Sequence, residues 1–118
     1  MGWEPAWRRQ GKEPDYRFSL ANERTFLAWL RTVLALLAAG VLLVQFATRL
    51  QPPALLAAVA VGLAVFAALA AVLAYRRWRD NELAMRLERP LPATGLVPLT
   101  AGGLALVSLA VAALMLRA

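Results

Sequence analysis

Three long apolar runs constrain the fold of this chain more than any other feature. The run from Ala54 to Tyr75 has no charged residue, and as a helix it is roughly 33 Å long, enough to cross a hydrocarbon core of about 30 Å. A second uncharged run covers Leu96 to Leu116, and a first apolar segment precedes both. We therefore predict an all-α integral membrane protein with three spans, at about residues 26–48, 54–75 and 96–116.

Prolines separate the predicted spans. The turn Gln51-Pro52-Pro53 places a proline at the start of the second helix, and Pro90 and Pro92 end the segment before the third. No helix breaker lies between Pro53 and Pro90, so the second helix is free to continue past the membrane, where Glu82 and Arg86 have the i, i+4 spacing of an ion pair. On the second span the candidates for close helix contacts are Ala60, Ala64, Ala68, Ala67, Ala71 and Gly62, although this pattern could also simply reflect high alanine usage. On the third span the candidates are Gly102, Gly103, Ala101 and Ala105.

The chain begins with a polar segment. Residues 1–18 alternate tryptophan, proline and charge without a helical period, which predicts a surface-lying or unstructured arm. Ser19 is a plausible N-cap for the first helix, and Asp15 is an earlier candidate. The predicted organisation is a polar arm over 1–18 and a three-helix transmembrane domain over 19–118, with a basic loop over 76–95.

Composition argues against an enzyme. Of 118 residues 61% are hydrophobic and the mean hydropathy is +0.59, which is typical of a small integral membrane protein. Cysteine and histidine are both absent, so disulfides, thiolate chemistry and imidazole metal sites are excluded. We predict no catalytic residue, no metal site and no cofactor. All seven acids lie outside the spans, which disfavours a proton-coupled or cation transporter.

The positive charges predict an orientation. Eleven of the 13 Lys and Arg residues lie before or at the start of the first span or between the second and third spans, leaving only Arg49 and Arg117 on the other side. The positive-inside rule then places the N-terminus in the cytoplasm and the C-terminus outside, in an up-down-up arrangement across the membrane. Anionic lipid headgroups or a polyanion are the natural partners of this charge. Membrane insertion accounts for the pI of about 11.3, so no nucleic acid is expected.

Two arginines share one face of the first predicted helix. Arg24 and Arg31 are seven residues apart, so they lie about 20° apart around the helix axis, with small residues continuing the face. Gln45 and Arg49 extend this face toward the far side. Arg31 has a plain alternative role, because an arginine near the membrane edge reaches the headgroups at a cost below the roughly 2.5–3.5 kcal/mol of a mid-membrane position. Arg49 has the alternative role of an interface anchor.

The segment ANERTFLAWLRT, residues 21–32, resembles the YidH-like family of small bacterial inner-membrane proteins, a domain of unknown function. The same domain forms the transmembrane part of the eukaryotic vacuolar transporter chaperone complex, which makes polyphosphate and passes it across a membrane. The resemblance implies a pentamer whose first helices surround a polyphosphate path. It also implies that Arg24 and Arg31 line that path and that Glu23 holds its opening together. This chain has neither the polymerase domain nor the phosphate-sensing domain of the large chaperone subunits.

The other polar residues near the cytoplasmic edge have two interpretations each. Asn22 and Thr25 are candidates for hydrogen bonds between helices, and Trp29 and Trp78 for interface anchors. The basic cluster Arg76, Arg77 and Arg79 is typical of a topology signal, and a second interpretation has it widening a funnel for a polyanion.

These observations predict a non-enzymatic membrane protein. The leading hypothesis is a homo-oligomeric, channel-like or accessory subunit that handles an anion such as polyphosphate along a path lined by the first helices. The alternative is a small membrane scaffold that binds another membrane protein and conducts nothing.

Overall fold

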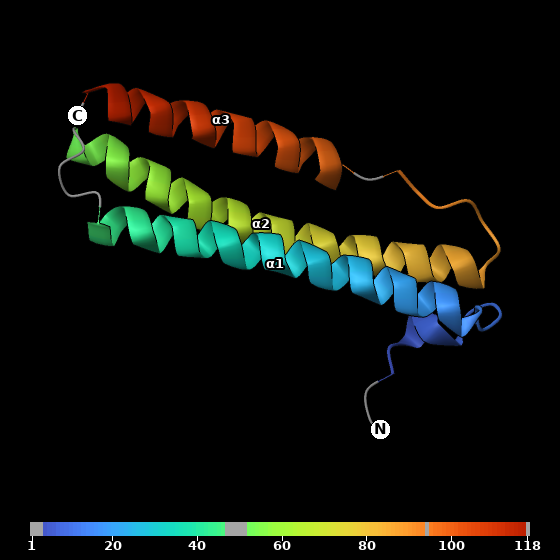
Figure 1. The fold of residues 1–118 in the computed structure, drawn as a ribbon. Helices are drawn as coiled ribbons and strands as arrows, with labels where there is room; N and C mark the ends of the chain where they lie inside the picture. The colour runs from blue at the N-terminus through green and yellow to red at the C-terminus, as the bar shows by residue number, and fades with distance from the viewer. Residues whose placement is uncertain (1–3, 47–51, 94, 118) are drawn as a thin grey trace.

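Within the residues that the structure describes, the chain forms three long helices and one short one (Figure 1). The computed structural model describes residues 4–46, 52–93 and 95–117. After a 3-10 helix η1 (Ala6–Arg9) come α1 (Tyr16–Phe46), α2 (Pro53–Arg86) and α3 (Leu96–Arg117). α1 and α2 lie side by side over most of their length, and α3 packs on α2. The result is an elongated molecule with extents of 57 × 29 × 21 Å.

Each long helix contains a stretch long and apolar enough to cross a membrane, which confirms the predicted all-α fold with three helices able to span it. α2 continues as one helix beyond Tyr75 to Arg86, so the basic segment starting at Arg76 is helical. This confirms the expectation that the second helix continues past its apolar run, so the first half of the predicted basic loop over 76–95 is helical. The reason is that residues 76–86 contain no helix breaker and pack on α1 and on the arm, which keeps the helix intact outside its apolar run.

Asp15 starts α1. Its carboxylate Oδ1 accepts the backbone N–H of Arg17 at 2.9 Å, and its carbonyl accepts the N–H groups of Phe18 and Ser19. The hydrogen bonds from the Arg17 side chain and backbone hold the pKa of Asp15 below its usual value. The earlier of the two N-cap candidates is thus correct, and Ser19 is wrong as the cap because it lies inside the helix, with its hydroxyl directed to α2.

Small residues let α1 and α2 approach each other closely. On α2 the buried side chains Ala60, Leu63, Ala67, Ala70 and Ala74 follow one another at three- to four-residue intervals, and all but Leu63 are alanines. On α1 a Cβ at Gly40 would lie 3.2 Å from the carbonyl oxygen of Ala60. Among the contact residues predicted on this helix, Ala60 and Ala67 are buried and Ala71 is half-buried. The others face outward: Ala64, Ala68 and Gly62.

Of the three long helices, α3 has the least contact with the rest of the described chain. Leu96 and Leu114 are fully buried, and a Cβ at Gly103 would lie 2.5 Å from the Phe66 ring of α2, as expected for a close-packing glycine. Gly102 has nothing within 4 Å of such a Cβ. Most other apolar side chains of α3 are exposed, as they are on a helix that faces lipid.

Candidate functional site

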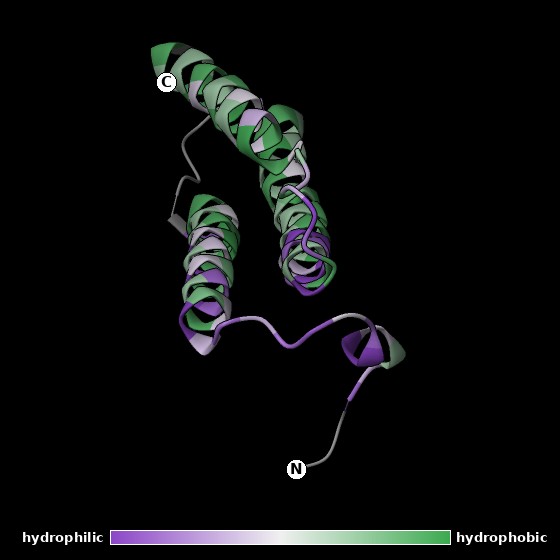
Figure 2. Cartoon of the chain, turned by 90° about the vertical axis from the view of Figure 1, so that its right-hand side faces the viewer, coloured by the Kyte–Doolittle hydropathy of each residue, from purple (hydrophilic) through white to green (hydrophobic). Residues whose placement is uncertain are grey.

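Polar side chains gather at one end of the helix bundle. Figure 2 shows hydrophilic residues at the ends of α1 and α2 that lie nearest the N-terminal arm. We call this region, residues 4–25 and 76–93, the polar end. It contains every predicted polar site residue except Arg31, Gln45 and Arg49.

Ser19 and Asn22 of α1 bind α2 through a buried hydrogen-bond cluster at the polar end. The Asn22 side-chain amide donates to the Trp78 carbonyl at 3.0 Å and to Glu82 Oε1 at 3.4 Å. Its oxygen accepts from Asn81 Nδ2 at 3.4 Å, and the Ser19 hydroxyl donates to Glu82 Oε2 at 3.2 Å. Both oxygens of one carboxylate and both ends of one amide are used, so the cluster fixes the register of α1 against α2.

Glu82 is the acidic member of this cluster and is only 5% exposed. Its carboxylate accepts from neutral donors, and the ion pairs of the described residues do not include it. The predicted Glu82–Arg86 pair is therefore wrong: Glu82 turns toward α1, while the Arg86 guanidinium binds the arm. Helical spacing alone had indicated the pair, but contacts from other segments compete for both side chains.

Arg24 and Arg31 lie on the face of α1 opposite α2. Both are exposed, as are Ala28, Ala35 and Ala38 on the same face. Val33 and Leu36 pack in the core, and at about 100° per residue they point to the other side of the helix. The structure thus brings the two arginines onto one open face. Within the described part of the chain, neither has an ion-pair partner.

The remaining predicted residues are more scattered. Thr25 donates its hydroxyl to the Ala21 carbonyl of its own helix at 3.1 Å, and Glu23 is exposed. Gln45 is exposed near the other end of α1, and Arg49 lies outside the described residues.

The basic cluster lies on α2. Arg76 is exposed and Arg77 is half-buried, lining a pocket of about 260 Å³ beside Asn22 and Asn81. Arg79 pairs with Asp80 at 3.2 Å. In the described structure these three arginines therefore lie in different environments and do not line one common cavity.

The N-terminal arm is docked on the end of α2, which the sequence did not predict. The Lys12 N–H donates to the Arg86 carbonyl at 2.9 Å, and Arg86 Nη1 donates to the Arg8 carbonyl. The Trp7 ring meets the Trp78 ring edge-on at 5.6 Å, so both indoles pack on each other. Gly11, with φ +65°, makes the approach feasible, because a Cβ there would lie 2.2 Å from the Arg86 carbonyl oxygen. The sequence signal for this contact was a single glycine, between Gln10 and Lys12, in the polar arm.

The acidic residues of the described chain do not form a metal site. No group of three or more Asp or Glu side chains there is arranged to hold an ion. The features that characterise the polar end are the hydrogen-bond cluster between α1 and α2, exposed arginine side chains and the docked arm.

The fold and this site define a small multi-pass membrane protein whose first two helices are joined at one polar end. The family model for a domain of unknown function, DUF202, matches residues 17–84, more than half of the chain. The chain belongs to this DUF202, or YidH-like, family and is a multi-pass inner-membrane protein. The matched region includes the whole buried cluster, from Ser19 to Glu82, and leaves out the arm, Arg86 and α3.

Several relatives are similar over most of their length. The inner membrane protein YidH of Escherichia coli (strain K12) is 54% identical over 86 residues, which cover 73% of this chain and 75% of that protein. An uncharacterised protein of Mycobacterium tuberculosis (strain ATCC 25618 / H37Rv) is 52% identical over 80 residues, or 68% of this chain and 66% of the relative. No solved structure matches the chain.

Proposed function

We propose that this protein is a non-enzymatic, homo-oligomeric subunit that handles an anion such as polyphosphate along a path lined by α1. In this proposal the N-terminus and the polar end are cytoplasmic and the C-terminus is outside, as the distribution of Lys and Arg indicates. Arg24 and Arg31 are the residues that attract the anion at the cytoplasmic opening.

The observation that carries the proposal is the open arginine face of α1. Arg24 and Arg31 point away from α2, and neither has a carboxylate partner among the described residues. An arginine beside an apolar span faces a bundle interior or a water-filled path more often than lipid. Packing several copies around this face would surround each arginine with water and with its equivalents, which is a favourable environment for a polyanion.

The same face is suited to packing between copies. Ala28, Ala35 and Ala38 are small and exposed, so helices from neighbouring copies are able to approach closely there. A pentamer follows only from the resemblance to the chaperone complex. Arg76 and Arg77, at the same end, would add positive potential around the opening, and Gln45 would continue the face toward the other side.

Anion flux tests the proposal. Liposomes containing the purified protein should pass polyphosphate or a smaller anion, and the double variant R24A/R31A should reduce this flux by about tenfold or more, because the local anion concentration falls with the positive potential. The matched control R9A/R89A also removes two exposed arginines, but from outside α1. Equal flux from the two double variants would remove the path from the proposal.

The scaffold function remains the second candidate, and a groove favours it. An apolar pocket of about 470 Å³ opens between the three helices, lined by Ala39 and Leu43 of α1, Leu63 of α2 and Val107 of α3. A transmembrane helix of another protein would bury this surface. A partner recovered in equal amount by crosslinking, together with no anion flux in any variant, would favour the scaffold.

A further inference from the structure

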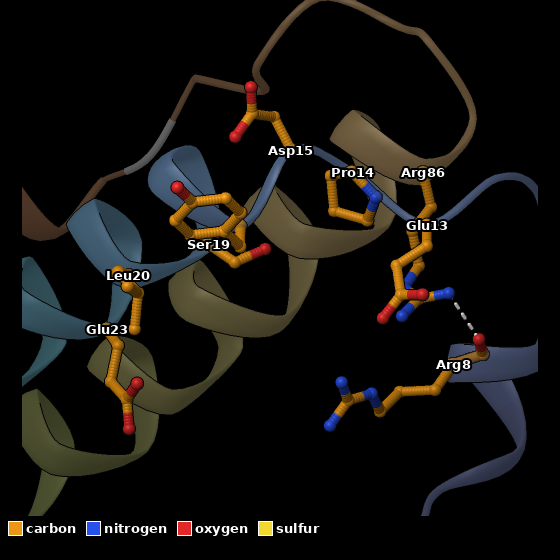
Figure 3. Close-up of a pocket in the computed structure, with 9 residues that line it drawn as sticks. Arg8, Glu13, Pro14, Asp15, Ser19, Leu20, Glu23 and Arg86 are labelled. Carbon is orange, nitrogen blue, oxygen red and sulfur yellow. Dashed lines mark hydrogen bonds between the residues drawn. The ribbon is translucent and has the colours of Figure 1, made fainter.

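A pocket of about 810 Å³ lies between the docked arm and the first turns of α1 (Figure 3). The arm contributes Arg8 and Glu13, α1 contributes Ser19 and Glu23, and α2 contributes Arg86. A volume of this size falls within the range of about 300–1,000 Å³ that small-molecule sites occupy. The pocket exists only because the arm is docked, since the arm forms one of its walls.

Arg86 is the unusual residue of this pocket. It is 7% exposed, its Nη1 donates to the Arg8 carbonyl, and its Nε is buried without a hydrogen-bond acceptor. Among the described residues, no carboxylate lies within ion-pair distance of its guanidinium. A buried positive charge without an opposite charge is strongly unfavourable, so an anionic group from a ligand would stabilise it.

The remaining charges restrict what this ligand is. Arg8 adds a second guanidinium, whereas Glu13 and Glu23 add two exposed carboxylates without ion-pair partners in the described chain. Asp15 also lines the pocket, but it is already bound to Arg17. These carboxylates would repel a polyanion. Two guanidinium groups and two free carboxylates around one cavity instead match a ligand that carries both signs of charge.

The distance of the pocket from the membrane indicates a water-soluble ligand. Arg86 lies eleven residues beyond Tyr75 on one continuous helix, or roughly 16 Å past the end of the apolar run. A headgroup layer extends only about 5–8 Å beyond the hydrocarbon core on each side. The guanidinium that would receive the anionic group therefore lies beyond the reach of a lipid phosphate.

We propose that this pocket binds a small soluble zwitterion. Arg86 and Arg8 bind its phosphate or carboxylate group, and Glu13 and Glu23 bind its ammonium group. The site is independent of the anion path proposed for α1, because it uses neither Arg24 nor Arg31 and selects against polyanions.

Binding to the full chain in detergent tests this site. Calorimetry with O-phosphoethanolamine and with β-alanine shows whether a phosphate or a carboxylate zwitterion is preferred, with inorganic phosphate and ethanolamine as half-ligands. We expect at least one zwitterion to bind, about tenfold or more tightly than either half-ligand, because only the zwitterion satisfies both sets of charges.

The variant R8Q is the sharpest probe, because Arg8 contacts Arg86 through its backbone carbonyl and the substitution leaves that contact in place. R8Q should weaken zwitterion binding by about tenfold or more, since charge-assisted hydrogen bonds are the stronger ones, whereas R89Q, an exposed arginine outside the pocket, should not. E23Q should weaken zwitterion binding but not phosphate binding, which should stay equal or become tighter because one repelling carboxylate is removed. Equal binding by R8Q and R89Q, or no zwitterion binding up to about 10 mM, would overturn the proposal.

Discussion

At the polar end, some contacts between segments depend on the identity of a single residue. Gly11 is the clearest case, because it combines a positive φ with a close approach to the Arg86 carbonyl. A residue with a Cβ disfavours this backbone conformation and also needs the space that the carbonyl oxygen occupies. The docked arm therefore depends on the absence of one side chain.

We expect G11A to release the arm from α2. The Lys12 amide, which donates to the Arg86 carbonyl, should then lose protection in hydrogen exchange, and residues 4–14 should exchange at least about tenfold faster. The control is G95A, because nothing lies within 4 Å of a Cβ at Gly95. Unchanged exchange of the arm in G11A would contradict the docking described above.

At the scale of elements, α1 and α2 are joined by two kinds of contact. In the apolar part, alanines and Gly40 allow close packing, while at the polar end Asn22 and Ser19 hydrogen-bond to α2. The apolar contacts still form when α1 slides slightly along α2. The amide of Asn22, which uses both its nitrogen and its oxygen, forms its hydrogen bonds in one register of the two helices. The polar cluster therefore specifies the alignment of the pair.

Removing the Asn22 side chain should destabilise the helix pair. In N22A the Asn81 amide and Glu82 lose buried hydrogen bonds, which should lower the free energy of unfolding in detergent by about 1–2 kcal/mol. T25A is the matched control, because the Thr25 hydroxyl bonds only within α1, and its effect should stay within about 0.5 kcal/mol. Equal losses in thermal unfolding would show that the cluster does not join the helices.

The elements themselves were largely predictable, and their cross-contacts were not. Apolar length and proline positions give three helices because these signals are local. Whether Glu82 binds Arg86 or Asn22 depends on the relative register of α1 and α2, which no local pattern encodes. The same holds for Arg86, whose spacing indicated a surface ion pair although the arm buries it. Arg24 and Arg31 were assigned to one face correctly, since helical periodicity alone determines it.

At the scale of the whole molecule, the charge distribution sets the expected orientation. The chain contains no cysteine, so single cysteines report accessibility without background. In intact spheroplasts A54C, at the start of α2, should react with a membrane-impermeant maleimide, whereas K12C should react only after the membrane is opened. The parent chain is the unlabelled control. Labelling of K12C in intact spheroplasts would reverse the proposed topology and place the arginine face outside.

The order of the helices has a consequence for any assembly built around α1. α2 lies between α1 and most of α3. The arginine face of α1 points away from α2. A ring of copies around that face would therefore have concentric layers, with α1 innermost and α3 as the outer belt. Lipids and neighbouring proteins would meet mainly α3, which lies outside the matched family region 17–84. The innermost helix would then govern what passes, and the outermost would govern where in the membrane the assembly resides.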